Sequence, residues 1–294
     1  MSELSAADSH LAQAEDRLYQ KFAACRGKPN WDDPLDNKSH DDNLSVVRYT
    51  VRQLPVEHFA YYGWHAMGFS GGEVAAIKYF FPRVLSEAAN PPEYKCDLPN
   101  SPLPLPKEMY IDYLNKRNWL EWREPERNAI VDLFLAWFAA SLADSHFADY
   151  RRERRASFVL RFAAFAQVDI HPFLTQWSHD ESLIASLQLA AFIHDQESLL
   201  ITRATLDGWA NIWGSAGVSP DQISHVARFL TSARTYSRIE RAFFAATDDS
   251  AQKTLASAVA TLQNAYVAWH QTLRGTGQIP HWAETVAAEM SQTT

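Results

Sequence analysis

Apolar residues recur at intervals of three and four along most of this chain, which is the spacing of one face of an α-helix. The first such segment ends at Gly27 and carries on one face Leu11, Ala14, Leu18, Phe22 and Cys25. Others begin near Pro55, Pro125, Ser182, Glu197, Ser219 and Asp248 or Asp249, and a last one follows Pro280. Only 10 of the 294 residues are glycine, which is few for a many-turned β-protein. The chain is therefore predicted to be all-α.

One predicted helix, within residues 69–89 (FSGGEVAAIKYFFPRVLSEAA), has a proline near its middle. Ser70 and Glu73 form a capping box before it. A single apolar stripe runs through Pro82 without a change of phase: Val74, Ile77, Phe81, Val84, Leu85 and Ala88. Proline removes a helix hydrogen bond, so we expect a kink with a continuous buried face. Stacked helices that wrap a curved core use such bends, and the predicted fold is an irregular helical stack, an α-α superhelix.

The predicted helices show no fixed repeat length and no convincing domain boundary. We therefore expect one elongated helical domain over residues 1–294, with a proline-rich connection at residues 90–106. The most apolar run, residues 129–143, is interrupted by Asp132 and Ser141 and is too short for a membrane span. The first residues also lack the apolar run of a secretory signal. These features predict a soluble protein that does not contact a membrane.

The net charge narrows the classes of partner that the chain can bind, and the cysteine content indicates its cellular compartment. The net charge is −8, whereas nucleic-acid binding needs a surplus of Lys and Arg, so the charge argues against nucleic acid as a partner and is compatible with a basic protein. Cys25 and Cys96 stand alone, without the spacing of a zinc site. Two isolated cysteines in a chain of this size suggest a reducing compartment, and the predicted location is the cytoplasm.

Two His-Asp dipeptides, His179-Asp180 and His194-Asp195, are the strongest candidates for catalysis, with Asp169 and His171 nearby. Adjacent His and Asp can ligate a divalent metal in helical phosphohydrolases, which is the alternative function. Both pairs also fit helix ends, where a protonated His is favoured by the dipole. The sequence has no HExxH, P-loop or GxSxG motif. We expect no enzyme activity, no bound metal and no cofactor.

One dense basic cluster, within residues 150–162 (YRRERRASFVLRF), contains Arg151, Arg152, Arg154, Arg155 and Arg161. Arginines flanked by aromatic residues are typical of a nucleic-acid patch, and nucleic-acid binding is the second alternative function. An exposed helix face whose arginines pair with neighbouring carboxylates explains the same residues. We favour the second interpretation.

Four segments carry a resemblance to known proteins. The main one is KYFFPRVLSE, residues 78–87, after YYGWHAMGFSGGE; the others are DIHPFLTQW at 169–177, NIWGS at 211–215 and VARFLTSARTYSRIERAFFAA at 226–246. With these segments the chain resembles a family of bacterial all-helical, HEAT-like proteins without an established activity, and the resemblance implies a HEAT-like form of the helical stack. The chain departs from the family pattern with Gly68-Phe69-Ser70 in place of a Trp-Gly turn, and with Phe81 in place of Leu. Proteins of this kind occur among the immunity partners of bacterial toxins, so the resemblance implies that function.

Two segments have the mixture of aromatic and acidic residues that a binding surface needs. One is the acidic stretch with Asp32, Asp33, Asp36, Asp41 and Asp42, and the other is NWLEWREPE, with Trp119, Glu121, Trp122 and Glu124. Trp is highly buried on average, so the two tryptophans also fit a place between helices. The predicted function is a non-catalytic protein-binding module, an immunity protein that neutralises a basic toxin.

Overall fold

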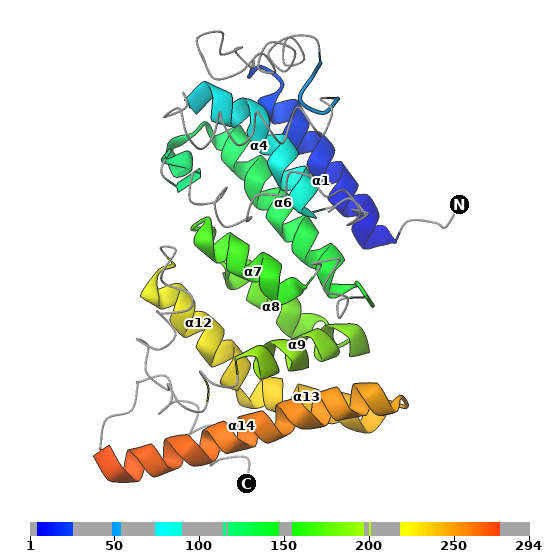
Figure 1. Ribbon diagram of the computed structural model, residues 1–294, viewed down its shortest axis with the longest axis vertical. Helices are drawn as coiled ribbons and strands as arrows, with labels where there is room; N and C mark the ends of the chain where they lie inside the picture. Colours follow the sequence, from blue (N-terminus) through cyan, green and yellow to red (C-terminus); the bar gives the residue numbers. More distant parts are fainter. Residues whose placement is uncertain are drawn as a thin grey trace, which may run out of the picture. The chain divides into compact units, whose positions relative to one another are not determined.

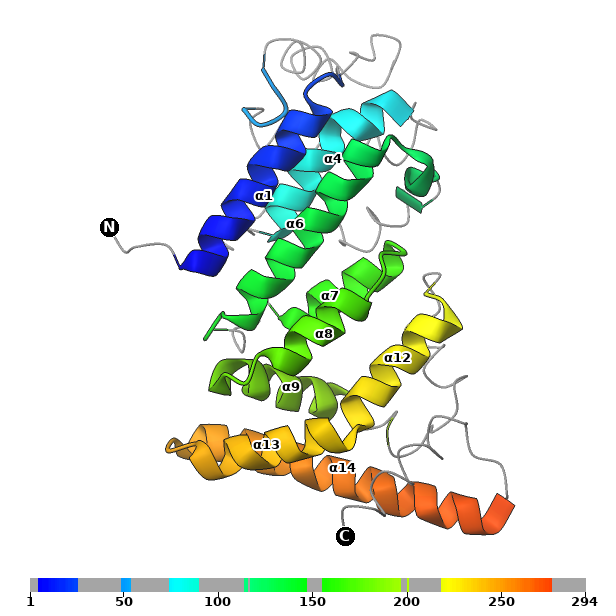
Figure 2. The same cartoon turned by 180° about the vertical axis from the view of Figure 1, so that it is seen from behind.

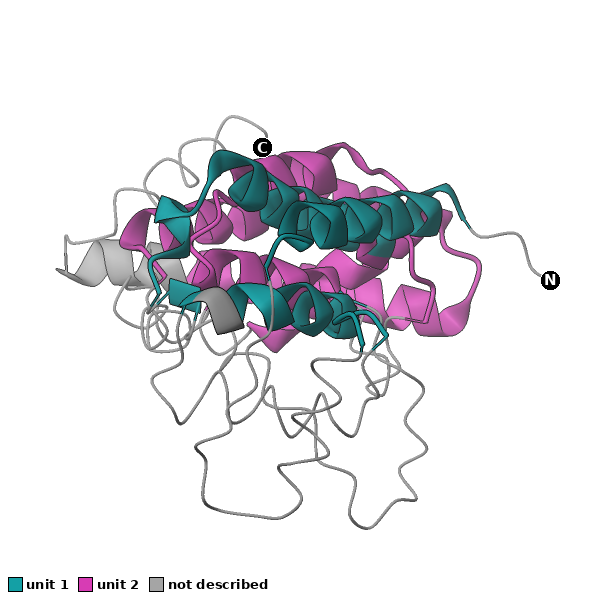
Figure 3. Ribbon diagram, turned by 90° about the horizontal axis from the view of Figure 1, so that it is seen from above, with its two compact units in different colours: residues 1–140 teal, residues 141–294 magenta. Residues whose placement is uncertain are grey.

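The computed structural model describes residues 5–25, 49–53, 74–89, 114–115, 117–146, 155–196, 200 and 218–276. Across these ranges every regular element is a helix, which confirms the predicted all-α class (Figure 1). The chain separates into two compact units, residues 1–140 and 141–294 (Figure 3). The HEAT-like character and the single elongated domain stay predictions.

The first unit contains α1 (Ala6–Phe22), α4 (Val74–Ala89), the short 3-10 helix η2 (Trp119–Glu121) and nearly all of α6 (Glu124–Leu142). The two views in Figures 1 and 2 show α1, α4 and α6 side by side. Ser5 caps α1, since its hydroxyl accepts a hydrogen bond of 3.1 Å from the amide of Asp8. The predicted stripe of α1 is confirmed, because its four helical members are buried: Leu11, Ala14, Leu18 and Phe22. Cys25 lies beyond the helix end and is half-buried.

The helix α4 continues through Pro82, as the apolar stripe predicts. Four residues of that stripe are buried, namely Ile77, Phe81, Val84 and Leu85. The prediction was wrong at Val74, which is 41% exposed because it occupies the first turn of the helix as described. Ala88 is half-buried. The capping box of Ser70 and Glu73 lies outside the described residues, and the kink at Pro82 stays a prediction.

The helix α6 begins one residue before Pro125, where the proline fits the first turn without losing a helix hydrogen bond. Its large apolar residues are buried: Ile130, Leu133, Phe134, Trp137 and Phe138. Together with the stripes of α1 and α4 they form the apolar interior of the first unit.

The second unit contains α7 (Ala156–Phe165), α8 (His171–His179), α9 (Leu183–Asp195), α12 (Pro220–Thr231), α13 (Ala233–Ala245) and α14 (Asp249–Thr276). Here α9 packs against α7, α13 and α14, while α12 contacts α8 and α13. Two predicted helix starts are confirmed. Ser182 caps α9, and Ser219 forms a capping box with Gln222 at the start of α12. The indole of Trp177 stacks on Phe192 with 5.9 Å between ring centroids, at the centre of this core.

Several predicted elements lie outside the described residues: the segments that begin near Pro55 and Glu197, the segment after Pro280, and the proline-rich connection at residues 90–106. Among the described helices, none combines the length and the apolarity that crossing a membrane requires.

Candidate functional site

The segment NWLEWREPE forms a tight turn whose direction is set by Asn118. This residue has φ 47° and ψ 49°, a left-handed conformation that asparagine tolerates better than most residues. The 3-10 helix η2 follows it at once. As a result Trp119 and Trp122 both turn inward, with exposed fractions of 1% and 6%. The structure thus places both tryptophans in the core of the first unit and not at its surface. This is the position between helices that the high average burial of Trp also allowed.

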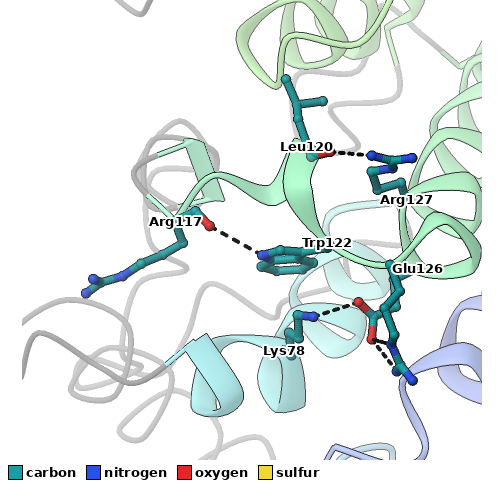
Figure 4. A network of polar contacts seen from close by, with 7 residues as sticks. Lys78, Arg117, Leu120, Trp122, Glu126 and Arg127 are labelled. Carbon is teal, nitrogen blue, oxygen red and sulfur yellow. Dashed lines mark hydrogen bonds and ion pairs between the residues drawn. The ribbon is translucent and has the colours of Figure 1, made fainter.

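Trp122 is held by contacts from three separate segments of the first unit. Its indole nitrogen donates a 3.3 Å hydrogen bond to the carbonyl of Arg117 (Figure 4). Phe22 and Phe81 meet its ring edge-on, with centroids 6.0 and 6.1 Å away. The ammonium of Lys78 lies 4.7 Å from the ring centre, within the range of a cation–π contact. Trp122 therefore joins α1, α4 and the turn before α6.

The same ammonium reaches a buried carboxylate, Glu126, which is 1% exposed (Figure 4). Lys78 Nζ lies 2.7 Å from one carboxylate oxygen, and Arg123 Nη2 lies 2.5 Å from the other. Burial by itself would raise the pKa of Glu126, but the hydrogen bonds and charges of Lys78 and Arg123 outweigh burial, so the pKa is lowered from its ordinary value of 4.5. Glu126 therefore stays ionised and fixes the position of Lys78.

The lowered pKa of Glu126 predicts a pH dependence of stability. A carboxyl group with a lower pKa in the folded state stabilises the fold above its unfolded pKa, and this contribution is lost as pH falls through the folded value. Chemical denaturation of the wild-type protein and of Glu126→Gln at several pH values measures it. The difference between their free energies of unfolding should be largest near neutral pH and should shrink below about pH 4. A difference that does not vary with pH would contradict the ion pairing.

Because the two tryptophans turn inward, the residues beside them are held outward. Leu120 is 43% exposed, and Glu121 and Glu124 are exposed. The guanidinium of Arg127 donates a hydrogen bond of 2.5 Å to the carbonyl of Leu120, which ties the outer side of the turn to α6. We call Leu120, Glu121 and Glu124 the Leu120 surface. It retains two of the predicted binding residues, Glu121 and Glu124.

The other predicted binding residues, Asp32, Asp33, Asp36, Asp41 and Asp42, lie outside the described residues. Leu120 was missed, because an isolated leucine between two tryptophans is expected to be buried like its neighbours. The signal that could have revealed it is the spacing of the two tryptophans, three residues apart in Trp-Leu-Glu-Trp, which places both on one side of a short helical turn and the residues between them on the other.

The pair His179-Asp180 lies where α8 ends and α9 begins. His179 occupies the last turn of α8, and its Nδ1 is 2.7 Å from the carbonyl of Thr175. Asp180 follows as the cap residue and accepts a 3.0 Å hydrogen bond from the amide of Ser182, which in turn caps α9. The polar groups of this pair thus take part in the turn between two helices.

The pair His194-Asp195 ends α9, as the helix-end interpretation expects. Asp195 forms an exposed ion pair of 3.3 Å with Arg155. Asp169 accepts a 3.0 Å hydrogen bond from the amide of His171 at the start of α8. Within the described part of the chain, no three His, Cys, Asp or Glu side chains are grouped so as to hold a metal ion.

Two arginines of the basic cluster are described, and each has a local contact. Arg155 pairs with Asp195, and the guanidinium of Arg161 lies 5.0 Å from the ring centre of Phe165. Arg151, Arg152 and Arg154 lie outside the described residues. The ion pair between Arg155 and Asp195 agrees with the interpretation that arginines of this cluster pair with neighbouring carboxylates.

A buried arginine in the second unit was also missed. Arg238 of α13 is 5% exposed; its Nε donates to the hydroxyl of Ser186 at 3.1 Å and its Nη1 to the carbonyl of Trp177 at 2.5 Å. Burial lowers the pKa of Arg238, while the charges of Asp180 and Glu181 act in the opposite direction. The signal lay in the spacing, because Arg238 shares the buried face of α13 with Thr235 and Ile239.

Comparison with known proteins adds no relative. The chain matches no protein-family model, and neither the curated proteins nor the solved structures contain a match to it. The resemblance to bacterial HEAT-like proteins stays a prediction.

Proposed function

We propose that this chain is a non-catalytic protein-binding module, an immunity protein that neutralises a basic toxin through the Leu120 surface. The observation that carries the proposal is the construction of the turn: two buried tryptophans form a base that holds an exposed leucine beside two exposed carboxylates. A preformed surface loses little conformational entropy on binding. An apolar anchor with charged neighbours is a common basis of protein recognition.

The exposed carboxylates of the Leu120 surface and the net charge of the chain favour a basic partner. Arg123 and Lys78 are paired with the buried Glu126, so part of the basic charge near the turn is already compensated inside the unit. Glu121 and Glu124 remain exposed. Exposed carboxylates attract a positively charged surface over a Debye length and mainly raise the rate of association. Together with the net charge of −8, they support a toxin with a basic binding or substrate cleft as the partner.

Co-expression with the product of the adjacent gene tests the proposal. We expect that product to inhibit growth alone and the full-length chain to restore growth. The double variant Glu121→Lys/Glu124→Lys and the single variant Leu120→Ser should protect less well, because they remove the steering charge and the apolar anchor. Each is expected to weaken binding by about tenfold or more, which corresponds to about 1.4 kcal/mol.

The matched control is Asp132→Lys, which reverses an exposed carboxylate farther along α6. It should protect as well as the wild-type protein. Equal protection by all variants would exclude the Leu120 surface. A harmless adjacent product, or one that inhibits growth equally in the presence of this chain, would exclude the immunity function.

A further inference from the structure

Two exposed histidines from different helices of the second unit lie side by side. His171 occupies the first turn of α8, and His225 lies near the middle of α12. The centroids of their imidazole rings are 6.3 Å apart, and the ring planes are inclined at 75°. Both residues are exposed, and the packing of α12 against α8 brings them together. Because they are far apart in the sequence, His225 could not be recognised as a neighbour of His171 from the pattern alone.

The backbone beneath this pair is held by the core of the unit. Gln222, one turn before His225, donates a 2.7 Å hydrogen bond from Nε2 to the carbonyl of Val168, just before α8. Apolar residues on both sides of each histidine are buried: Ile170, Phe173, Ile223 and Val226. The two helices are thus fixed to each other at this point, while the exposed imidazoles can still turn about their side-chain bonds.

The imidazole nitrogens of the pair are largely unused. His171 Nδ1 lies 3.5 Å from the hydroxyl of Thr175, which is the outer limit of a hydrogen bond. Among the described residues, His171 Nε2 and both ring nitrogens of His225 have no hydrogen-bond partner. A neutral imidazole nitrogen with a free lone pair is the commonest metal ligand in proteins. Each histidine can therefore offer a nitrogen to the same bound ion.

Acidic residues lie beside both histidines. Asp169 precedes His171 by two residues and accepts a 3.0 Å hydrogen bond from its backbone amide. Asp221 is exposed and lies one turn before His225, on the same side of α12. Arg228, one turn after His225, adds one positive charge. The charged residues within one helical turn of either histidine thus carry a net negative charge, which attracts a cation.

We propose that His171 and His225 together bind one divalent transition-metal ion, Cu²⁺ most tightly and Zn²⁺ more weakly. Imidazole suits both ions, and Cu²⁺ has the higher affinity for a given set of nitrogen ligands. Two imidazoles that share an ion at about 2.1 Å in a tetrahedral arrangement have ring centres about 5 Å apart. Rotation of the exposed side chains shortens the observed separation of 6.3 Å to that value. In the described part of the chain no third His, Cys, Asp or Glu is grouped with the pair, so water completes the coordination.

This metal site differs from the His-Asp dipeptides and departs from the sequence-based expectation of no bound metal. It is independent of the Leu120 surface, which belongs to the other unit. The proposal concerns binding and includes no catalytic step.

Copper binding by the full-length protein tests the site, with titration calorimetry for affinity and electron paramagnetic resonance for the nitrogen ligands. His171→Gln and His225→Gln should each weaken the binding of one Cu²⁺ per chain by about tenfold or more. The double variant should bind no more weakly than either single variant, because each substitution alone already removes the bridging pair. Lowering the pH from about 7.5 to about 5 should release the ion, since a protonated imidazole cannot bind a metal.

The matched control is His179→Gln, which removes an exposed histidine at the other end of α8 and should bind Cu²⁺ like the wild-type protein. Circular dichroism checks that all variants are folded. Unchanged binding in His171→Gln and His225→Gln, or a loss in only one of them, would overturn the site. Additive losses would show two separate ions, and an ion retained at pH 5 would exclude imidazole ligands; both contradict the proposal. None of these results bears on protection against a toxin, which the growth assay measures separately.

Discussion

Replacing Glu126 with glutamine is expected to lower the free energy of unfolding by about 3 kcal/mol, because the substitution leaves a partly buried ammonium without its charged partner. Lys78 is 17% exposed at its side chain and Glu126 is 1% exposed, so water compensates little of the loss. Urea denaturation near neutral pH measures the change. The control is Glu121→Gln, which removes an exposed carboxylate and should change stability by less than about 0.5 kcal/mol.

A double-mutant cycle distinguishes a specific pair from general sensitivity of the core. Lys78→Met alone leaves Glu126 buried with Arg123 as its remaining cation, whereas Lys78→Met with Glu126→Leu removes both charges from the pair. The loss of stability in the double variant should be smaller than the sum of the losses in the single variants Lys78→Met and Glu126→Leu, since well-packed apolar residues can replace a buried ion pair at little cost. Additive losses would show that the two side chains are not coupled.

The second large effect is expected at Arg238, where methionine should destabilise the protein by about 3 kcal/mol. Methionine keeps much of the side-chain length but removes the donors to Trp177 and Ser186, which connect α13 to the end of α8 and to α9. The control is Arg241→Met on the same helix, because the side chain of Arg241 is 62% exposed. Thermal and urea unfolding should both separate the two variants. Equal stability of Arg238→Met and Arg241→Met would contradict a connecting role for Arg238.

The helical class could be predicted because its signals are local. Ser182 and Ser219 precede apolar-periodic segments and cap the helices that follow them. The stripe through Pro82 likewise depends only on spacing within one helix, and it is wrong only at its margins, as at Val74. A periodic pattern identifies the buried face of a helix, whereas exposure at the first turn depends on what covers it.

The site was harder to predict because its contacts connect distant parts of the chain. Lys78 and Glu126 are 48 residues apart, and Arg238 and Trp177 are 61 apart, so neither pairing has a local signal. The inward position of Trp119 and Trp122 depends on the left-handed backbone of Asn118. Composition drew attention to the acidic and aromatic segment, but the division into a buried base and an exposed surface required the geometry of the turn.

The most direct test of the proposed function is the association rate of the purified full-length chain with the purified product of the adjacent gene, measured by surface plasmon resonance at low and at physiological salt. The account predicts saturable binding whose association slows as salt rises, and a slower association for Glu121→Lys/Glu124→Lys than for Asp132→Lys at low salt. No binding to a product that is toxic in the cell, or binding with the same rate for both variants at both salt concentrations, would contradict it.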